Sequence, residues 1–359
     1  MQEKRYFKSF DALRFMAFFK VFIFHLPIHN FPIFSYVKAG GGIGVMFFFV
    51  LSGFLITYII LEEKEVKGQL NLKNFFLRRI LRIWPLYYAM ILFAFLTPWI
   101  LELLGLTASD AGYAPNWWMS LGFLENYRMI LLGEYPNVAP LGVMWSLCIE
   151  EHFYLLWGLA LYFIPARRLP YLLAVSVLIA LLSRLAFFQR GWDSLDIFTN
   201  LDLFALGAIP AYLLTERKDS FRFPRFSKNT ARLLILLILL LVCIYPHISG
   251  QLHFIFGPLI LGIAFTWILI LFIPEDASLS ISDEALISVW GKYTYGLYVY
   301  HTIVIGLCMQ LWGRFFGEMG GYLESYLFGL LCLGLSILIS WLSYLLLEKP
   351  FLRLKRYFY

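Results

Sequence analysis

The feature that most constrains this chain is a series of long apolar runs, each long enough for a helix that crosses a bilayer. Ten runs follow one another, at 9–28, 41–61, 83–104, 140–164, 169–189, 197–215, 231–247, 253–273, 293–312 and 325–347. About 20 apolar residues in a helix span the ~30 Å hydrocarbon core of a membrane. Continuous runs favour helices over a transmembrane β-barrel, whose strands alternate in polarity. We therefore predict an all-α, polytopic membrane protein, with about ten transmembrane helices in one bundle and a single domain over residues 1–359.

The composition excludes the soluble classes of protein. Only 14% of the residues are Asp, Glu, Lys or Arg, against about 25% in a typical soluble domain. So few charges cannot cover a water-exposed surface of this size. The four cysteines lie in apolar runs, without metal-ligand spacing to one another or to a histidine, so we expect no metal site. The first run follows basic residues as a signal peptide would, but no small-residue cleavage site comes after it, and we expect it to be retained.

The basic residues orient the predicted helices. With a cytoplasmic N-terminus, 22 of the 29 Lys and Arg residues lie in cytoplasmic segments and four in outer segments. Cytoplasmic loops of membrane proteins carry such an excess of positive charge. We therefore predict a multi-pass protein of the cytoplasmic (inner) membrane with both termini in the cytoplasm. The net charge of +6 then reflects topology and not binding to nucleic acid.

Ionisable side chains within the runs indicate a candidate site, because each costs about 2.5–3.5 kcal/mol at mid-membrane. Arg14 and His25 are eleven residues apart, which places them on one face of a helix, about 16 Å apart along its axis. Glu150 and Tyr154 share a face at i and i+4, whereas Glu151 points about 100° away. Such groups could line an internal polar cavity. Alternatively they could pair with one another as structural contacts, an interpretation that has more weight for two further residues, Arg184 and Asp202, than for the others.

Two more groups belong to the same pattern. Tyr298 and His301 share a face of the ninth run at i and i+3. On the cytoplasmic side, Arg79 and Arg82 lie one turn apart at the entry to the third run, next to Arg78. Forked guanidinium donors suit phosphate groups, although anchoring to lipid headgroups is an equally good interpretation of this spacing.

Six motifs occur in order along nearly the whole chain: Phe10-Asp11-Ala12-Leu13-Arg14 with His25, Gly44 to Phe54, Arg79-Ile80-Leu81-Arg82 with Trp84-Pro85, Trp145 to Tyr154, Tyr295-Gly296-Leu297-Tyr298 with His301, and Glu348-Lys349-Pro350. In this order they resemble the membrane-bound acyltransferase 3 family, the O-acyltransferases of surface polysaccharides, peptidoglycan and other acceptors. Two positions depart from the family pattern: Ala12 replaces a glycine, and Thr199-Asn200-Leu201 lacks the arginine often found upstream of Asp202. Few residues follow the last run, so we expect no appended extracytoplasmic domain.

The resemblance implies an enzyme, an O-acetyltransferase that moves an acyl group, usually acetyl, from cytoplasmic acetyl-CoA or another acyl-CoA to a hydroxyl of an extracytoplasmic acceptor. A surface polysaccharide or other glycan is the expected acceptor. His25 would act as general base or as a transient acyl carrier. Glu150 would orient the His25 imidazole, and Arg14 would stabilise negative charge on the thioester.

The remaining candidate residues are assigned to the two substrates. Those expected to bind the acceptor are Glu151, Tyr154, Tyr298 and His301. Those expected to hold the acyl-CoA phosphates are Arg78, Arg79 and Arg82. The alternative function is a transporter or flippase of a lipid-linked saccharide or small anion, but a carrier should show two related halves, and none is visible. The sequence specifies neither the acyl chain length nor the oligomeric state.

Overall fold

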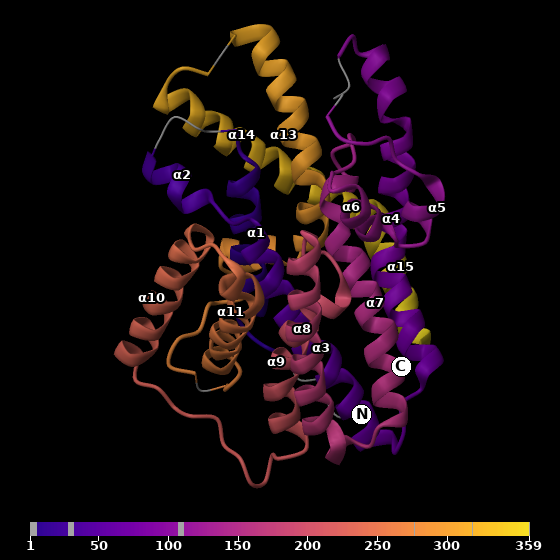
Figure 1. Ribbon diagram of the computed structural model, residues 1–359, viewed down its shortest axis with the longest axis vertical. Coiled ribbons are helices and arrows are strands. Elements are labelled where there is room, and N and C mark those ends of the chain that lie inside the picture. Colours follow the sequence, from indigo (N-terminus) through magenta and orange to yellow (C-terminus); the bar gives the residue numbers. More distant parts are fainter. Residues whose placement is uncertain (1–5, 28–31, 107–110, 276, 318, 359) are drawn as a thin grey trace. The chain divides into compact units, whose positions relative to one another are not determined.

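A computed structural model describes residues 6–27, 32–106, 111–275, 277–317 and 319–358. The described residues are mainly helical and contain one isolated β-bridge, between Tyr113 and Pro136. This confirms the predicted all-α class. The α-helices (Figure 1) are α1 (Phe10–His25), α2 (Pro32–Lys38), α3 (Gly42–Lys67), α4 (Leu72–Leu103), α5 (Trp117–Leu121), α6 (Glu125–Leu132), α7 (Leu141–Phe163), α8 (Leu169–Arg190), α9 (Ile197–Thr215), α10 (Lys228–Ile244), α11 (Gln251–Phe272), α12 (Leu286–Gly291), α13 (Thr294–Phe316), α14 (Tyr322–Ser343) and α15 (Lys349–Leu354).

Seven helical segments of the described chain are long and apolar enough to cross a membrane, and they contain α3, α4, α8, α9, α10, α11 and α14. Three predicted spans correspond instead to α1, α7 and α13. Helix α1 has only 16 residues, and α7 and α13 have 23 each but contain more polar side chains. A multi-pass membrane protein is therefore supported, and the count of about ten helices stays a prediction. The three helices outside the seven carry most of the candidate site residues.

Residues 62–82 connect the second and third apolar runs and are predicted to lie on the cytoplasmic side. The helices on both sides of this segment extend into it, further than the apolar runs suggested. Helix α3 continues to Lys67, and α4 begins at Leu72, where the side chain of Asn71 caps it by accepting a hydrogen bond from the amide of Asn74. Hydropathy alone placed the third span at 83–104 because charged residues interrupt the apolar run. Arg78, Arg79 and Arg82 therefore lie inside α4.

The chain forms two compact units. The first contains residues 6–24, 32–70 and 156–292 of the described chain, with α3, α8, α9 and α11 packed together. Gly53 of α3 lies against the backbone of Phe204, and Gly207 of α9 lies against the backbone of Val50; a Cβ atom at either glycine would collide with a carbonyl oxygen. Helices α3 and α9 therefore cross at backbone contact, as small residues permit in membrane proteins.

The second unit contains residues 25–27, 71–155 and 293–358 of the described chain. Helices α13 and α14 pack together, and α4 contacts α15 and the π-helix that precedes it. This π-helix, Tyr344–Glu348, interrupts the regular helix between α14 and α15. π-Helical turns are rare in proteins, and those that do occur are often found at functional sites. Glu348, its last residue, is buried.

Candidate functional site

His25 and His301 face each other within the second unit. His25 is the last residue of α1, and its Nδ1 lies 3.3 Å from Nε2 of His301 on α13. The rings meet edge to face, with centroids 4.9 Å apart. His301 is fully buried and His25 is half-buried. The structure thus brings together two residues that the sequence placed in one site, and their predicted roles stay predictions.

Tyr298 holds α13 against the beginning of α7. Its hydroxyl donates to the carbonyl oxygen of Val143 at 2.9 Å and lies 2.7 Å from the hydroxyl of Ser146. Since Tyr298 precedes His301 by one turn on the same face, these contacts help to fix the rotation of α13 that directs His301 towards His25. Tyr298 therefore joins two helices, whereas its predicted contact with an acceptor stays a prediction.

The adjacent carboxylates Glu150 and Glu151 have different partners, as their 100° separation predicted. Glu150 accepts a hydrogen bond from Tyr154 at 2.8 Å, the i and i+4 pair expected from the sequence. Glu151 accepts one from the indole of Trp84 on α4 at 3.2 Å. The other carboxylate oxygen of Glu151 is buried and has no hydrogen-bond partner among the described residues. Glu151 therefore has capacity to accept a hydrogen bond from a bound molecule.

Arg79 lies beside these carboxylates. Its guanidinium carbon is 6.0 Å from the centroid of the Tyr154 ring and 5.9 Å from that of Phe75. Its charge also acts on the carboxylate of Glu151. The arginine motif of α4 and the acidic motif of α7 therefore meet in the second unit.

Arg78 and Arg82 differ from Arg79 in their surroundings. Arg78 is buried and donates to the backbone carbonyl of Phe358 at 2.7 Å, which ties α4 to the C-terminal segment. The charge of Arg82 acts on Glu348 at the end of the π-helix. Of the three arginines expected to hold phosphates, Arg78 thus has a clear structural contact.

Arg14 belongs to the first unit, where its guanidinium forms an ion pair with Asp11, one turn earlier in α1. Helix α1 is uninterrupted from Phe10 to His25, so Arg14 and His25 lie along one side of it as predicted. A role for Arg14 at the reacting acyl group stays a prediction.

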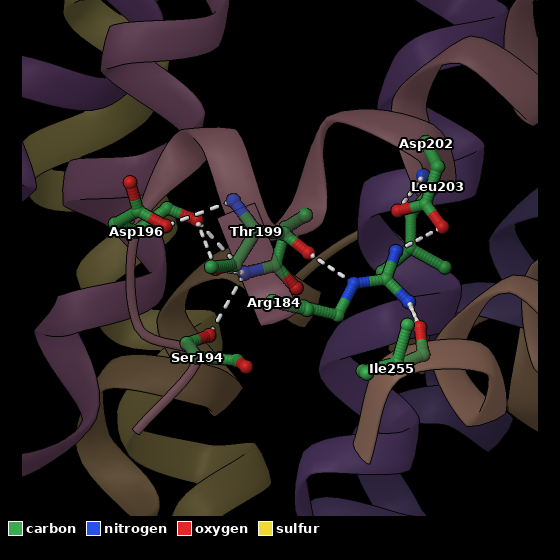
Figure 2. Close-up of polar contacts among 8 residues, drawn as sticks. Arg184, Ser194, Asp196, Thr199, Asp202, Leu203 and Ile255 are labelled. Atoms are coloured by element: carbon green, nitrogen blue, oxygen red, sulfur yellow. Dashed lines mark hydrogen bonds and ion pairs between the residues drawn. The ribbon is translucent and has the colours of Figure 1, made fainter. Parts of the chain in front are cut away.

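A second polar cluster joins α8, α9 and α11 within the first unit (Figure 2). Arg184 donates to the carbonyl oxygens of Thr199 at 2.9 Å and Ile255 at 2.5 Å, and it forms an ion pair with Asp202. Both charged side chains are 0% exposed. Asp202 also accepts from the backbone amide of Leu203 at 3.0 Å. Each nitrogen of the guanidinium thus has an acceptor, and this geometry fits the structural interpretation that the sequence left open for these two residues.

A buried acidic residue between α4 and α7, Glu125, was not predicted from the sequence. Glu125 is fully buried and accepts hydrogen bonds from Tyr113 and Ser120, both at 2.6 Å. Arg128 lies over the Tyr113 ring, 4.4 Å from its centroid. Burial, together with the neighbouring carboxylate, raises the pKa of Tyr113, so its hydroxyl keeps the proton that it donates. No periodic pattern connects these residues, and only the fold reveals the network.

The helical fold and its long apolar helices indicate a multi-pass membrane protein, and each of its two units contains buried polar side chains. The chain belongs to the acyltransferase 3 family, since the model of that family, described as an acyltransferase domain, matches residues 7–345. The family predicted from the sequence is therefore confirmed, and with it an acyltransferase domain.

Similar proteins carry related names. The peptidoglycan O-acetyltransferase OatA of Listeria monocytogenes is 30% identical over 328 residues, which cover 85% of this chain and 50% of the relative. The putative peptidoglycan O-acetyltransferase YrhL of Bacillus subtilis is 27% identical, covering 97% of this chain and 55% of the relative. A putative O-acetyltransferase of Staphylococcus aureus is 25% identical, covering 98% and 58%. The chain therefore spans about half the length of these curated relatives. No solved structure matches it.

Proposed function

We propose that this protein transfers an acetyl group from cytoplasmic acetyl-CoA to a hydroxyl of a glycan outside the cytoplasmic membrane, with both termini in the cytoplasm. The names of the relatives favour peptidoglycan as the glycan. The comparisons give no support to the alternative of a transporter or flippase.

The histidine pair carries this proposal. His25 acts as general base: it takes the proton of the acceptor hydroxyl while the oxygen attacks the thioester carbonyl. A carbon–oxygen bond forms, the carbon–sulfur bond breaks, and the proton passes to the leaving thiolate. An imidazole can accept a proton and return it, which suits both proton transfers.

Further charged residues have proposed roles in the reaction. Arg14 stabilises the negative charge that develops on the thioester. Arg79 and Arg82 hold the phosphates of acetyl-CoA through their forked donors. Glu151, with its unpaired carboxylate oxygen, accepts a hydrogen bond from the acceptor glycan.

The test is a transfer assay with the full chain in lipid nanodiscs. Acetyl-CoA is supplied with soluble peptidoglycan fragments or with a different surface polysaccharide, and both free thiol and acetylated product are measured. We expect thiol release that depends on acceptor, a mass increase of one acetyl group per modified sugar, and loss of both in His25→Ala. Thiol release without an acetylated glycan, or equal turnover by His25→Ala, would contradict the proposal.

A further inference from the structure

The hydrogen bonds of His301 determine which of its ring nitrogens carries a proton. Its Nδ1 lies 2.7 Å from the carbonyl oxygen of Tyr298 and 3.2 Å from that of Leu297. Carbonyl oxygens only accept hydrogen bonds, so Nδ1 of His301 must be the donor. In a neutral imidazole the other nitrogen then accepts. Nε2, which faces His25, is therefore the acceptor nitrogen of His301.

The same reasoning assigns the tautomer of His25. Its Nδ1 lies 3.3 Å from Nε2 of His301. Because that nitrogen accepts, Nδ1 of His25 must donate. A neutral His25 then has its lone pair on Nε2, at the opposite side of the ring from His301. The backbone of α13 thus fixes the tautomer of His301 through one hydrogen bond, and His301 fixes the tautomer of His25 through a second.

We propose that His301 is a positioning residue for acyl transfer, because its Nε2 holds His25 in the tautomer that presents the Nε2 lone pair to the acceptor hydroxyl. This inference rests on the proposed function, in which His25 is the base. The proton moves from the hydroxyl to Nε2 of His25 and later to the leaving thiolate. His301 gains no proton; its hydrogen bond orients His25 and stabilises the imidazolium, as the carboxylate does in a serine hydrolase triad.

The surroundings of His301 suit this role. Its ring is fully buried, so water does not compete for Nε2. Its Nδ1 is bonded to the backbone of its own helix, which Tyr298 ties to α7. On the His25 side of the histidine pair, the next residue, Leu26, packs beside Gly329 of α14. The sequence suggested that His301 binds the acceptor, whereas its hydrogen bonds assign it to His25.

The first test reads the tautomer directly and needs no activity. Protein labelled with ¹⁵N at its six histidines is studied by solid-state NMR, and His25→Asn identifies the His25 signals. We expect His25 to carry its proton on Nδ1 in the wild type and in His301→Gln, whose amide oxygen can accept. In His301→Phe, which has no acceptor, His25 should move towards the Nε2-protonated form. A wild-type His25 protonated on Nε2, or no change in His301→Phe, would overturn the proposal.

The second test is kinetic. His301→Phe should lower kcat by about 10²–10⁴-fold with little change in either KM, and His301→Gln should recover part of the loss. Residues that act as one unit are non-additive, so His25→Ala and the double variant with His301→Phe should have equal residual rates. Additive losses, or a raised acceptor KM at unchanged kcat, would refute the positioning role. If the wild type transfers no acetyl group, the proposed function fails while the NMR result still decides the tautomer. If His301→Phe does not fold, the wild-type tautomer decides.

Discussion

Replacing Arg184 by methionine should strongly destabilise the first unit. The substitution removes three hydrogen bonds at once, and it leaves the buried Asp202 carboxylate with backbone amide donors, including that of Leu203, but without its cationic partner. Removing one partner of a buried ion pair costs about 3–5 kcal/mol, because the other charge stays uncompensated. Since both side chains are 0% exposed, neither water nor salt screens this loss. We therefore expect Arg184→Met to lose about 3–5 kcal/mol of unfolding free energy.

The assay is reversible unfolding in mixed micelles, followed by tryptophan fluorescence. Arg190→Met is the matched control, because Arg190 lies on the same helix but is exposed; its loss should cost less than about 0.5 kcal/mol. The double variant Arg184→Met with Asp202→Asn removes both charges, so it should be more stable than Arg184→Met alone.

Two results would refute this reasoning. One is a loss below about 1 kcal/mol for Arg184→Met, a value typical of exposed pairs. The other is a double variant whose loss equals the sum of the two single losses, because residues in one ion pair should be coupled.

Three further predictions concern other parts of the molecule. Arg79→Ala and Arg82→Ala should raise KM for acetyl-CoA more than they lower kcat, since binding energy from a remote part of the donor appears mainly in KM; a lower kcat at unchanged KM would contradict the phosphate contact. In intact cells, an impermeant thiol reagent should label the cysteine of Glu134→Cys, predicted to lie outside, but not that of Gln69→Cys, predicted to lie in the cytoplasm. The opposite labelling pattern would show that the predicted topology is inverted. Tyr113→Phe should cost about 1–3 kcal/mol, because a buried carboxylate loses a donor, and hydrogen exchange over 111–139 should increase; unchanged exchange would show that the bond contributes little.

The sequence predicted features that depend on local spacing. The apolar runs predicted the helices because burial in lipid needs a fixed length of apolar chain. The pairing of Glu150 with Tyr154 followed from helical geometry alone. Helix boundaries were less accurate, because a helix continues through charged residues such as Arg79 wherever its backbone hydrogen bonds are satisfied, and hydropathy does not record those bonds.

Contacts between distant segments could not be predicted in the same way. His25 and His301 are 276 residues apart, and no periodicity states that their rings meet or which nitrogen faces which. The burial of Glu125 depends on a loop that folds back through Tyr113. Both features arise from tertiary packing, which a single sequence does not encode as a spacing.

The π-helix at Tyr344–Glu348 has a consequence for how this region can change in evolution. A π-turn is equivalent to an α-helix with one inserted residue, so a single-codon deletion would convert it to regular helix. The chain would remain helical, but every later residue would rotate by about 100°, and Glu348 would leave its buried position near Arg82. The same deletion in a surface loop would only shorten that loop. We therefore expect functional descendants of this gene to tolerate substitutions across 344–347 and to reject changes of length there.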